Sequence, residues 1–299
     1  QCLVGSEMCI RDSFREYSKE FVTKIREIAD CVAKADVLSS LAQTAVENNF
    51  CKPEIDESGD FIVRNGRHPV LEKILPLGEY VANDLELQSN TMDKTQFMIL
   101  TGPNMAGKST YMRQNALIAL LAQIGSWVPA DYLKLGVIDK IFTRVGASDD
   151  LTLGQSTFMV EMIETAYILN AATDKSFILL DEIGRGTSTY DGVAIAWSVA
   201  EYIATRVKAR CIFATHYHEL NVMTKTYPQI KNYRITVTEE NGEIEFLRKI
   251  VQGGASKSYG IQVAKMAGLP SAVIRRSQDL MVKMQKDFSN NLATRKKSD

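Results

Sequence analysis

The chain has 299 residues, of which 45% are hydrophobic, and it carries 35 Lys and Arg against 36 Asp and Glu. This apolar content is enough to bury the core of one large domain, or of one domain with a helical extension. The net charge of −1 excludes an overall basic surface, so any surface that binds a nucleic-acid backbone must be local or lie outside this sequence.

Because no apolar run approaches the roughly 18 residues of a membrane span, we expect a soluble protein without a membrane partner. The five cysteines are scattered and odd in number, which fits reduced thiols in the cytosol better than disulfides or a zinc site.

The amino end divides into two segments. Residues 1–13 show no clean apolar stretch or periodicity, so we expect neither a signal peptide nor a helix there and treat them as an extraneous start on a fragment of a longer protein. Residues 14–50 contain no Pro or Gly before Phe50, and their apolar residues recur at helical spacing. This pattern predicts one long helix or two joined ones. The residues leave open whether it is a packing helix or a lever to upstream parts.

Pro53 and a cluster of turn residues at 56–59 mark a boundary, after which we expect β-type and irregular segments to about Leu87. An alternating α/β region follows them. Short apolar runs are typical of strands buried on both faces of a largely parallel sheet, and they occupy residues 97–101, 177–180 and 211–214. Helical stretches separate these runs, at residues 109–125, 157–172 and 193–207. The alternation predicts an α/β domain over residues 51–254 in which helices cover the sheet.

The carboxyl end is expected to be helical and then polar. Residues 258–267 and 271–286 have the composition of two helices, which are separated by Gly268, Leu269 and Pro270. We therefore treat residues 255–286 as a helix pair. The polar residues 287–299 form a tail that we expect to fray.

The strongest chemical signal is the loop GPNMAGKS, which matches G-x-x-x-x-G-K-[ST] and lies between an apolar strand and a helix. In such a loop the backbone N–H groups surround phosphates, and the start of the helix favours an anion. Lys108 is expected to reach the terminal phosphates, and Ser109 to supply an oxygen to Mg²⁺. The sequence therefore predicts ATP and Mg²⁺ as ligands of the loop, whose residues are Gly102, Pro103, Asn104, Met105, Ala106, Gly107, Lys108 and Ser109.

A second signal is an acidic pair at the end of the apolar run 177–180. Asp181 and Glu182 stand where α/β sheets bind their ligands, at the carboxyl end of a strand. Asp181 would contact Mg²⁺ or a water bound to it, and Glu182 could orient and deprotonate the water that attacks the terminal phosphate. Taken alone, such a pair is more often a solvated strand end. The phosphate loop upstream is the reason to favour function.

His216 follows the third apolar run, where an imidazole could hydrogen-bond the terminal phosphate or the attacking water. His68 and His218 lack that context, and we interpret both as structural. Two Gly- and Ser-containing segments, at 154–157 and 184–189, fit helix caps and a glycine-rich turn. They equally fit the second phosphate-binding helix start that a composite site between two subunits needs, and the residues leave both interpretations open.

Several long stretches closely resemble the MutS family of DNA mismatch-repair ATPases, of the bacterial type. They are TGPNMAGKSTYMRQ, FTRVGASDDL, QSTFMVEM, LLDEIGRGTSTYDG, FATHYHEL and ASKSYGIQVAKMAGLP, and the similarity covers roughly residues 14–286. The resemblance implies an ABC-type P-loop ATPase domain with a mixed, largely parallel sheet flanked by helices. It also implies a long lever helix over 14–50 and a helix-turn-helix over 255–286 that packs against a second subunit instead of reading DNA.

The resemblance also implies roles for individual residues. The loop Gly102–Ser109 and Thr110 would bind ATP, Ser109 and Asp181 would serve Mg²⁺, and Glu182 and His216 would serve hydrolysis. Asn104 would contact the γ-phosphate, Tyr80 would stack on adenine, and Ser156 would reach the γ-phosphate held by the partner subunit. The sequence departs from the family pattern at Ala106, where many members have glycine, and at Arg248, where a His can stand near the base.

At the level of function the resemblance implies a homodimer in the bacterial cytosol, associated with the nucleoid. ATP would close the dimer and move a clamp on mismatched double-stranded DNA, which domains absent from this chain would hold, and a MutL-type repair protein would be a partner. Three alternatives stand beside it: the recombination-suppressing MutS branch, a catalytically silent dimerisation scaffold, and a transporter ATPase. A transporter should show an LSGGQ-like signature, which residues 156–159 do not match.

Overall fold

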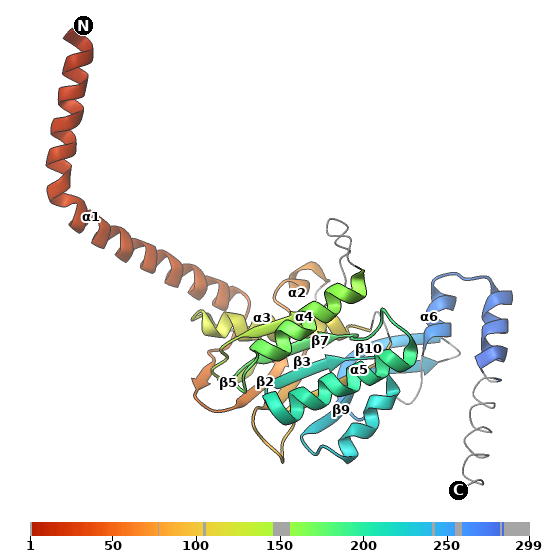
Figure 1. The fold of residues 1–299 in the computed structure, drawn as a ribbon. Coiled ribbons are helices and arrows are strands. Elements are labelled where there is room, and N and C mark those ends of the chain that lie inside the picture. The colour runs from red at the N-terminus through yellow and green to blue at the C-terminus, as the bar shows by residue number, and fades with distance from the viewer. Residues whose placement is uncertain are drawn as a thin grey trace.

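The computed structural model describes residues 2–76, 78–103, 106–145, 156–240, 243–254, 259–281 and 283. Its first element is α1 (Cys2–Glu47), a single helix of 46 residues that extends away from the rest of the molecule (Figure 1). The prediction of a long helix in residues 14–50 is confirmed. The prediction that the amino-terminal segment is not helical is wrong for residues 2–13, because they contain no Pro and a formed helix adds residues at little cost.

The centre of the molecule is a six-stranded sheet in the order β10-β9-β4-β8-β7-β6. Its strands are β4 (Phe97–Thr101), β6 (Ile141–Arg144), β7 (Phe177–Asp181), β8 (Arg210–Ala214), β9 (Ile230–Glu240) and β10 (Glu243–Gln252). Only β10 runs antiparallel to its neighbour, which confirms the expected mixed, largely parallel sheet. The three predicted apolar strands are β4, β7 and β8, which lie side by side. Because they are parallel, the loops that follow them meet at one edge of the sheet.

Helices cover this sheet in the places that the sequence predicted. They are α3 (Lys108–Gln123), α4 (Thr157–Ala171) and α5 (Thr189–Tyr202), which continues as the π-helix η1 (Ile203–Val207). Successive residues of the central strands point to opposite faces. Met98 and Leu100 join the core beneath α3, whereas Phe97 and Ile99 join the core beneath α4 and α5. Burial on both faces explains why these strands are continuously apolar.

A second, four-stranded sheet packs on the α3 side of the main sheet, and its order is β1-β5-β2-β3. Its strands are β1 (Glu54–Asp56), β2 (Asp60–Gly66), β3 (Asn83–Gln88) and β5 (Tyr132–Gly136), and the short helix α2 (Leu71–Ile74) follows β2. Arg210 at the start of β8 is fully buried and ties the two sheets together. Its guanidinium donates to the carbonyls of Gly136 at 2.9 Å and Lys175 at 2.7 Å, and burial lowers its pKa to about 10.

The end of the described chain holds the 3-10 helix η2 (His218–Lys225), the helix α6 (Gly260–Met266) and helical residues 271–281. The break between the last two helices falls at Gly268, whose φ of 84° is left-handed and suits glycine. The predicted helix pair is present, although residues 255–258 and 284–299 lie outside the described residues. Among the helices described, none has both the length and the apolar character that crossing a membrane requires.

Candidate functional site

The loop that the sequence predicts to bind phosphate joins β4 to α3. Gly107 precedes the helix with a φ of 105°, a left-handed conformation that glycine adopts without strain. Lys108 opens α3 and is buried, with its Nζ donating to the carbonyls of Gly102 at 2.7 Å and Pro103 at 3.1 Å. Burial lowers the pKa of this ammonium, and the carboxylates of Glu182 and Asp181 oppose that shift. Asn104 and Met105 lie outside the described residues.

Two oxygen-bearing side chains meet across the sheet edge. The Oγ of Ser109 donates to Oδ2 of Asp181 at 2.6 Å, so the first turn of α3 and the end of β7 are in direct contact. A hydroxyl and a carboxylate are hard oxygen ligands of the kind that Mg²⁺ prefers. Among the described residues, no group of three His, Cys, Asp or Glu side chains is gathered for a metal.

Glu182 has an unusual backbone for a residue with a side chain. Its φ is 56°, in the left-handed region, and its amide donates to the carbonyl of Ala214 on β8 at 2.8 Å. Such a conformation costs roughly 1–2 kcal/mol and persists only where the surroundings fix it. The carboxylate is largely buried and forms an ion pair with Arg185. The turn after β7 therefore holds Glu182 in one orientation.

These groups share one open cavity of about 330 Å³, lined by Pro103, Gly107, Lys108, Ser109, Thr110, Asp181, Glu182 and Arg185. Two cations face two carboxylates in it. The structure thus brings together the phosphate loop and the acidic pair that sequence reasoning had placed in separate motifs. Sequence reasoning included Arg185 only as part of the segment 184–189 and gave it no role of its own. Its position three residues after Glu182 was the available signal.

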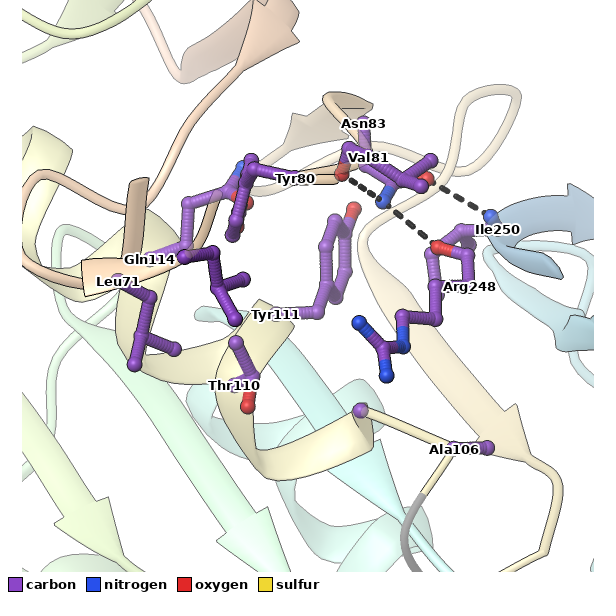
Figure 2. A pocket seen from close by; sticks show the side chains of 12 residues that line it. Leu71, Tyr80, Val81, Asn83, Ala106, Thr110, Tyr111, Gln114, Arg248 and Ile250 are labelled. Atoms are coloured by element: carbon purple, nitrogen blue, oxygen red, sulfur yellow. Dashed lines mark hydrogen bonds between the residues drawn. The ribbon is translucent and has the colours of Figure 1, made fainter. Parts of the chain in front are cut away.

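A second cavity, of about 250 Å³, adjoins the first because Gly107 and Thr110 line both. It is mainly apolar, and Figure 2 shows its side chains converging from α2, α3, the segment before β3, and β10. The hydroxyl of Tyr80 donates to Oε1 of Gln114 at 2.7 Å. Burial raises the pKa of Tyr80 to about 12, so its phenol stays protonated at neutral pH. Ala106 is fully buried in the floor of this cavity.

Arg248 enters the same cavity from β10 (Figure 2). Its φ is 54°, at an irregularity in the β9–β10 pairing between Phe246 and Ile250. Asn83 fixes this irregular segment, since its Nδ2 donates to the carbonyl of Arg248 at 3.0 Å and its Oδ1 accepts from the amide of Ile250 at 2.8 Å. A bulge of this kind redirects a side chain, here into the cavity.

Comparison with known proteins places these motifs in a family. The model of the family described as MutS domain V matches residues 98–285, which is more than half of the chain. The chain belongs to the MutS family. A relative named DNA mismatch repair protein MutS, from Clostridium botulinum strain Okra, is 50% identical over 291 residues, which are 97% of this chain and 31% of that protein. The protein of the same name from Flavobacterium johnsoniae is 53% identical over 273 residues, 91% of this chain and 31% of its own length.

The chain thus spans about a third of the length of its curated MutS relatives. The family resemblance carried by the sequence motifs is confirmed. The family match begins inside β4 and covers the phosphate loop, the acidic pair and the helix pair near the carboxyl end.

His216 does not belong to the described residues that line the polar cavity of this MutS-family chain. It is exposed, and its ring centroid lies 4.5 Å from that of Tyr217. Partial loss of water around the ring lowers the pKa of its imidazole, while the carboxylate of Glu182 opposes the shift. The imidazole is therefore neutral at neutral pH. His68, by contrast, has a local role, since its Nδ1 accepts from the amides of Val70 and Leu71 at 3.3 Å.

Ser156 caps the amino end of α4, where its Oγ accepts from the amide of Met159 at 3.2 Å. The residue is exposed, and neither described cavity includes it. Within one chain, Ser156 and Lys108 are therefore not brought into one of these described cavities.

Sequence reasoning did not predict most of the residues that line the apolar cavity, since Leu71, Gln114 and Ile250 belong to separate elements and carry no motif.

Proposed function

We propose that this MutS-family chain is an ABC-type ATPase domain that binds and hydrolyses ATP and dimerises as part of a DNA mismatch-recognition protein. The observation that carries the proposal is the pair of adjoining cavities. One is polar and contains Lys108, Ser109, Asp181 and Glu182, and the other is apolar and contains Tyr80. A nucleoside triphosphate has the same division into a charged and a flat, largely apolar end.

The residues present fit MgATP. Gly107 stands at the amino end of α3, which favours an anion. Lys108 would exchange its two loop carbonyls for phosphate oxygens, and Ser109 and Asp181 would hold Mg²⁺ between them. Tyr80 would lie against adenine, since aromatic rings stack on bases. When bound, MgATP supplies the γ-phosphoryl group that is transferred to water, with the metal offsetting part of the phosphate charge.

The protein's own groups then act on the attacking water. Glu182 would orient that water and accept its proton, because the fixed turn aims its carboxylate into the phosphate cavity. The neutral imidazole of His216 would hydrogen-bond the phosphate or the water. Asn104 would contact the γ-phosphate from the loop, and the left-handed backbone of Glu182 would keep the base in place.

The composite site and the remaining domain assignments belong to the same proposal. Ser156, exposed at the start of α4, would reach the nucleotide of a second copy of the chain. Residues 14–50 would act as the lever, 51–254 as the ATPase domain and 255–286 as the helix-turn-helix that packs on the partner. Mismatched DNA and a MutL-type protein would be bound by the longer protein in the bacterial cytosol. A composite site predicts an ATPase rate that rises with the square of chain concentration when dimers are scarce.

Nucleotide binding is tested by titrating the wild-type chain and Lys108→Ala with MgATP by calorimetry. Loss of a charge-assisted hydrogen bond costs about 1.5–3 kcal/mol, so affinity should fall at least about tenfold. Lys94→Ala is the matched control, since that lysine lies in the loop before β4 and lines neither cavity. Unchanged affinity in Lys108→Ala would count against the phosphate-loop assignment.

A further inference from the structure

A buried carboxylate outside the two cavities contacts the turn that carries Glu182. Glu161 lies on α4 and is 7% exposed. Its Oε1 accepts from the backbone amide of Gly184 at 2.6 Å, while its Oε2 lies 3.7 Å from Nη2 of Arg144. A buried charge is unfavourable unless it is paired and hydrogen-bonded. Here one of its oxygens is bonded to a single peptide group, two residues after Glu182.

Gly184 is held from its other side as well. Its carbonyl accepts from the hydroxyl of Tyr217 at 2.9 Å, and Tyr217 follows His216 in the loop after β8. The φ of Gly184 is 91°, and a side-chain carbon added there would lie 2.6 Å from the carbonyl oxygen of Gly192 on α5. The path of the turn is thus set by α4, by α5 and by the loop that carries His216.

A second contact joins the turn to the first turn of α4. A side-chain carbon at Gly186 would lie 2.7 Å from Cβ of Phe158, so only glycine fits against this helix. Phe158 is two residues after Ser156. The helix that presents Ser156 and the turn that presents Glu182 therefore touch on both sides of Arg185, through Gly184 and Gly186.

We propose that Glu161 is a positioning residue that fixes the Glu182 turn to α4, so that the Glu182 carboxylate and the Ser156 hydroxyl keep one relative placement. This inference rests on the proposed function, in which Glu182 serves hydrolysis and Ser156 serves the partner's nucleotide. Without the Gly184 hydrogen bond, the turn can relax and move Glu182 away from the attacking water. Nucleotide binding should survive, because Glu161 lines neither cavity.

The test compares kcat and MgATP affinity in wild-type chain, Glu161→Ala, Glu161→Gln and Glu164→Ala. A misplacement of about 1 Å can cost about a hundredfold in rate, so Glu161→Ala should lower kcat roughly tenfold to a hundredfold while Kd for MgATP changes less than about twofold. Glu161→Gln keeps an oxygen that can accept from Gly184 and should recover most of the rate. Glu164 is the matched control, because it pairs with Nε of Arg144 at 2.9 Å from the same helix and is half exposed.

The outcomes separate the two proposals. A wild-type chain that binds and turns over no ATP refutes the proposed function itself. An active wild type with undiminished kcat in Glu161→Ala overturns the positioning role alone, as does an equal loss in Glu164→Ala. If Glu161→Ala does not fold, Tyr217→Phe decides, because it removes only the hydroxyl on the other side of Gly184. A lowered kcat with unchanged affinity in that variant supports the proposal, and an unchanged kcat overturns it.

Discussion

The two ends of the candidate site are built in different ways. The polar end comes from two short, contiguous motifs, the loop Gly102–Ser109 and the pair Asp181 and Glu182. They lie at the same end of the sheet because they follow β4 and β7, two parallel strands on either side of β8. The apolar end is assembled from α2, the segment before β3, α3 and β10, which are up to 179 residues apart, from Leu71 to Ile250. The polar end is fixed by sheet topology, and the apolar end by side-chain packing. Substitutions should therefore affect chemistry at one end and base recognition at the other.

The largest effect is expected from Glu182→Gln. The amide keeps the size of the side chain but cannot accept the proton of the attacking water, so kcat should fall by about 10²–10⁴-fold. Affinity for MgATP should stay near wild type, because Lys108 and the loop are untouched. Single-turnover hydrolysis together with a binding titration measures both. Wild-type turnover in this variant would remove Glu182 from the role of base.

A smaller effect is expected at the apolar end. Tyr80→Ala removes the ring, and base stacking on an aromatic is worth about 1–3 kcal/mol, so affinity for ATP should fall roughly tenfold while inorganic tripolyphosphate binds as before. Tyr80→Phe is the matched control, since it keeps the ring and removes only the hydrogen bond to Gln114. An equal loss for ATP and tripolyphosphate in Tyr80→Ala would contradict the division between the two ends.

The smallest effect concerns His216 and is seen in the pH profile. Its lowered pKa means that the imidazole charges only below its ordinary value of about 6.5. If the neutral ring assists hydrolysis, the rate is fully present above that range and falls as pH drops through the folded pKa. His216→Gln should hydrolyse ATP about tenfold more slowly at neutral pH. Its rate should also no longer show the fall at acidic pH that protonation of His216 causes. If the pH dependence of the hydrolysis rate is unchanged in His216→Gln, groups other than His216 cause the loss of rate at acidic pH.

The contrast between the two ends also explains what could be predicted from the sequence. The strands β4, β7 and β8 were predictable because burial on both faces leaves a continuous apolar run. Asp181 directly follows one such run, and Lys108 follows another after the loop residues 102–107. The residues up to about Leu87 were expected to include β-type segments, but their pairing into a second sheet was not predicted, because the strands pair out of sequence order and include β5, far along the chain. The roles of Gln114 and Asn83 were equally hidden, because each depends on a partner brought near only by the fold.

The start of α1 shows a different limit. No local signal marked residues 2–13 as helical, and the helix that reaches them is formed by the residues that follow. Glu161 lies in the stretch QSTFMVEM, but the sequence predicted no role for it, because its partner Gly184 is 23 residues away.

The most direct test of the central claim, that the two cavities form one nucleotide site, is a competition titration of the wild-type chain. Bound MgATP is displaced with adenosine and, separately, with magnesium tripolyphosphate. If the cavities are two ends of one site, each competitor displaces MgATP completely and each binds more weakly than MgATP does. If adenosine leaves MgATP bound at saturation, or MgATP binds no more tightly than tripolyphosphate, the apolar cavity is not part of the nucleotide site.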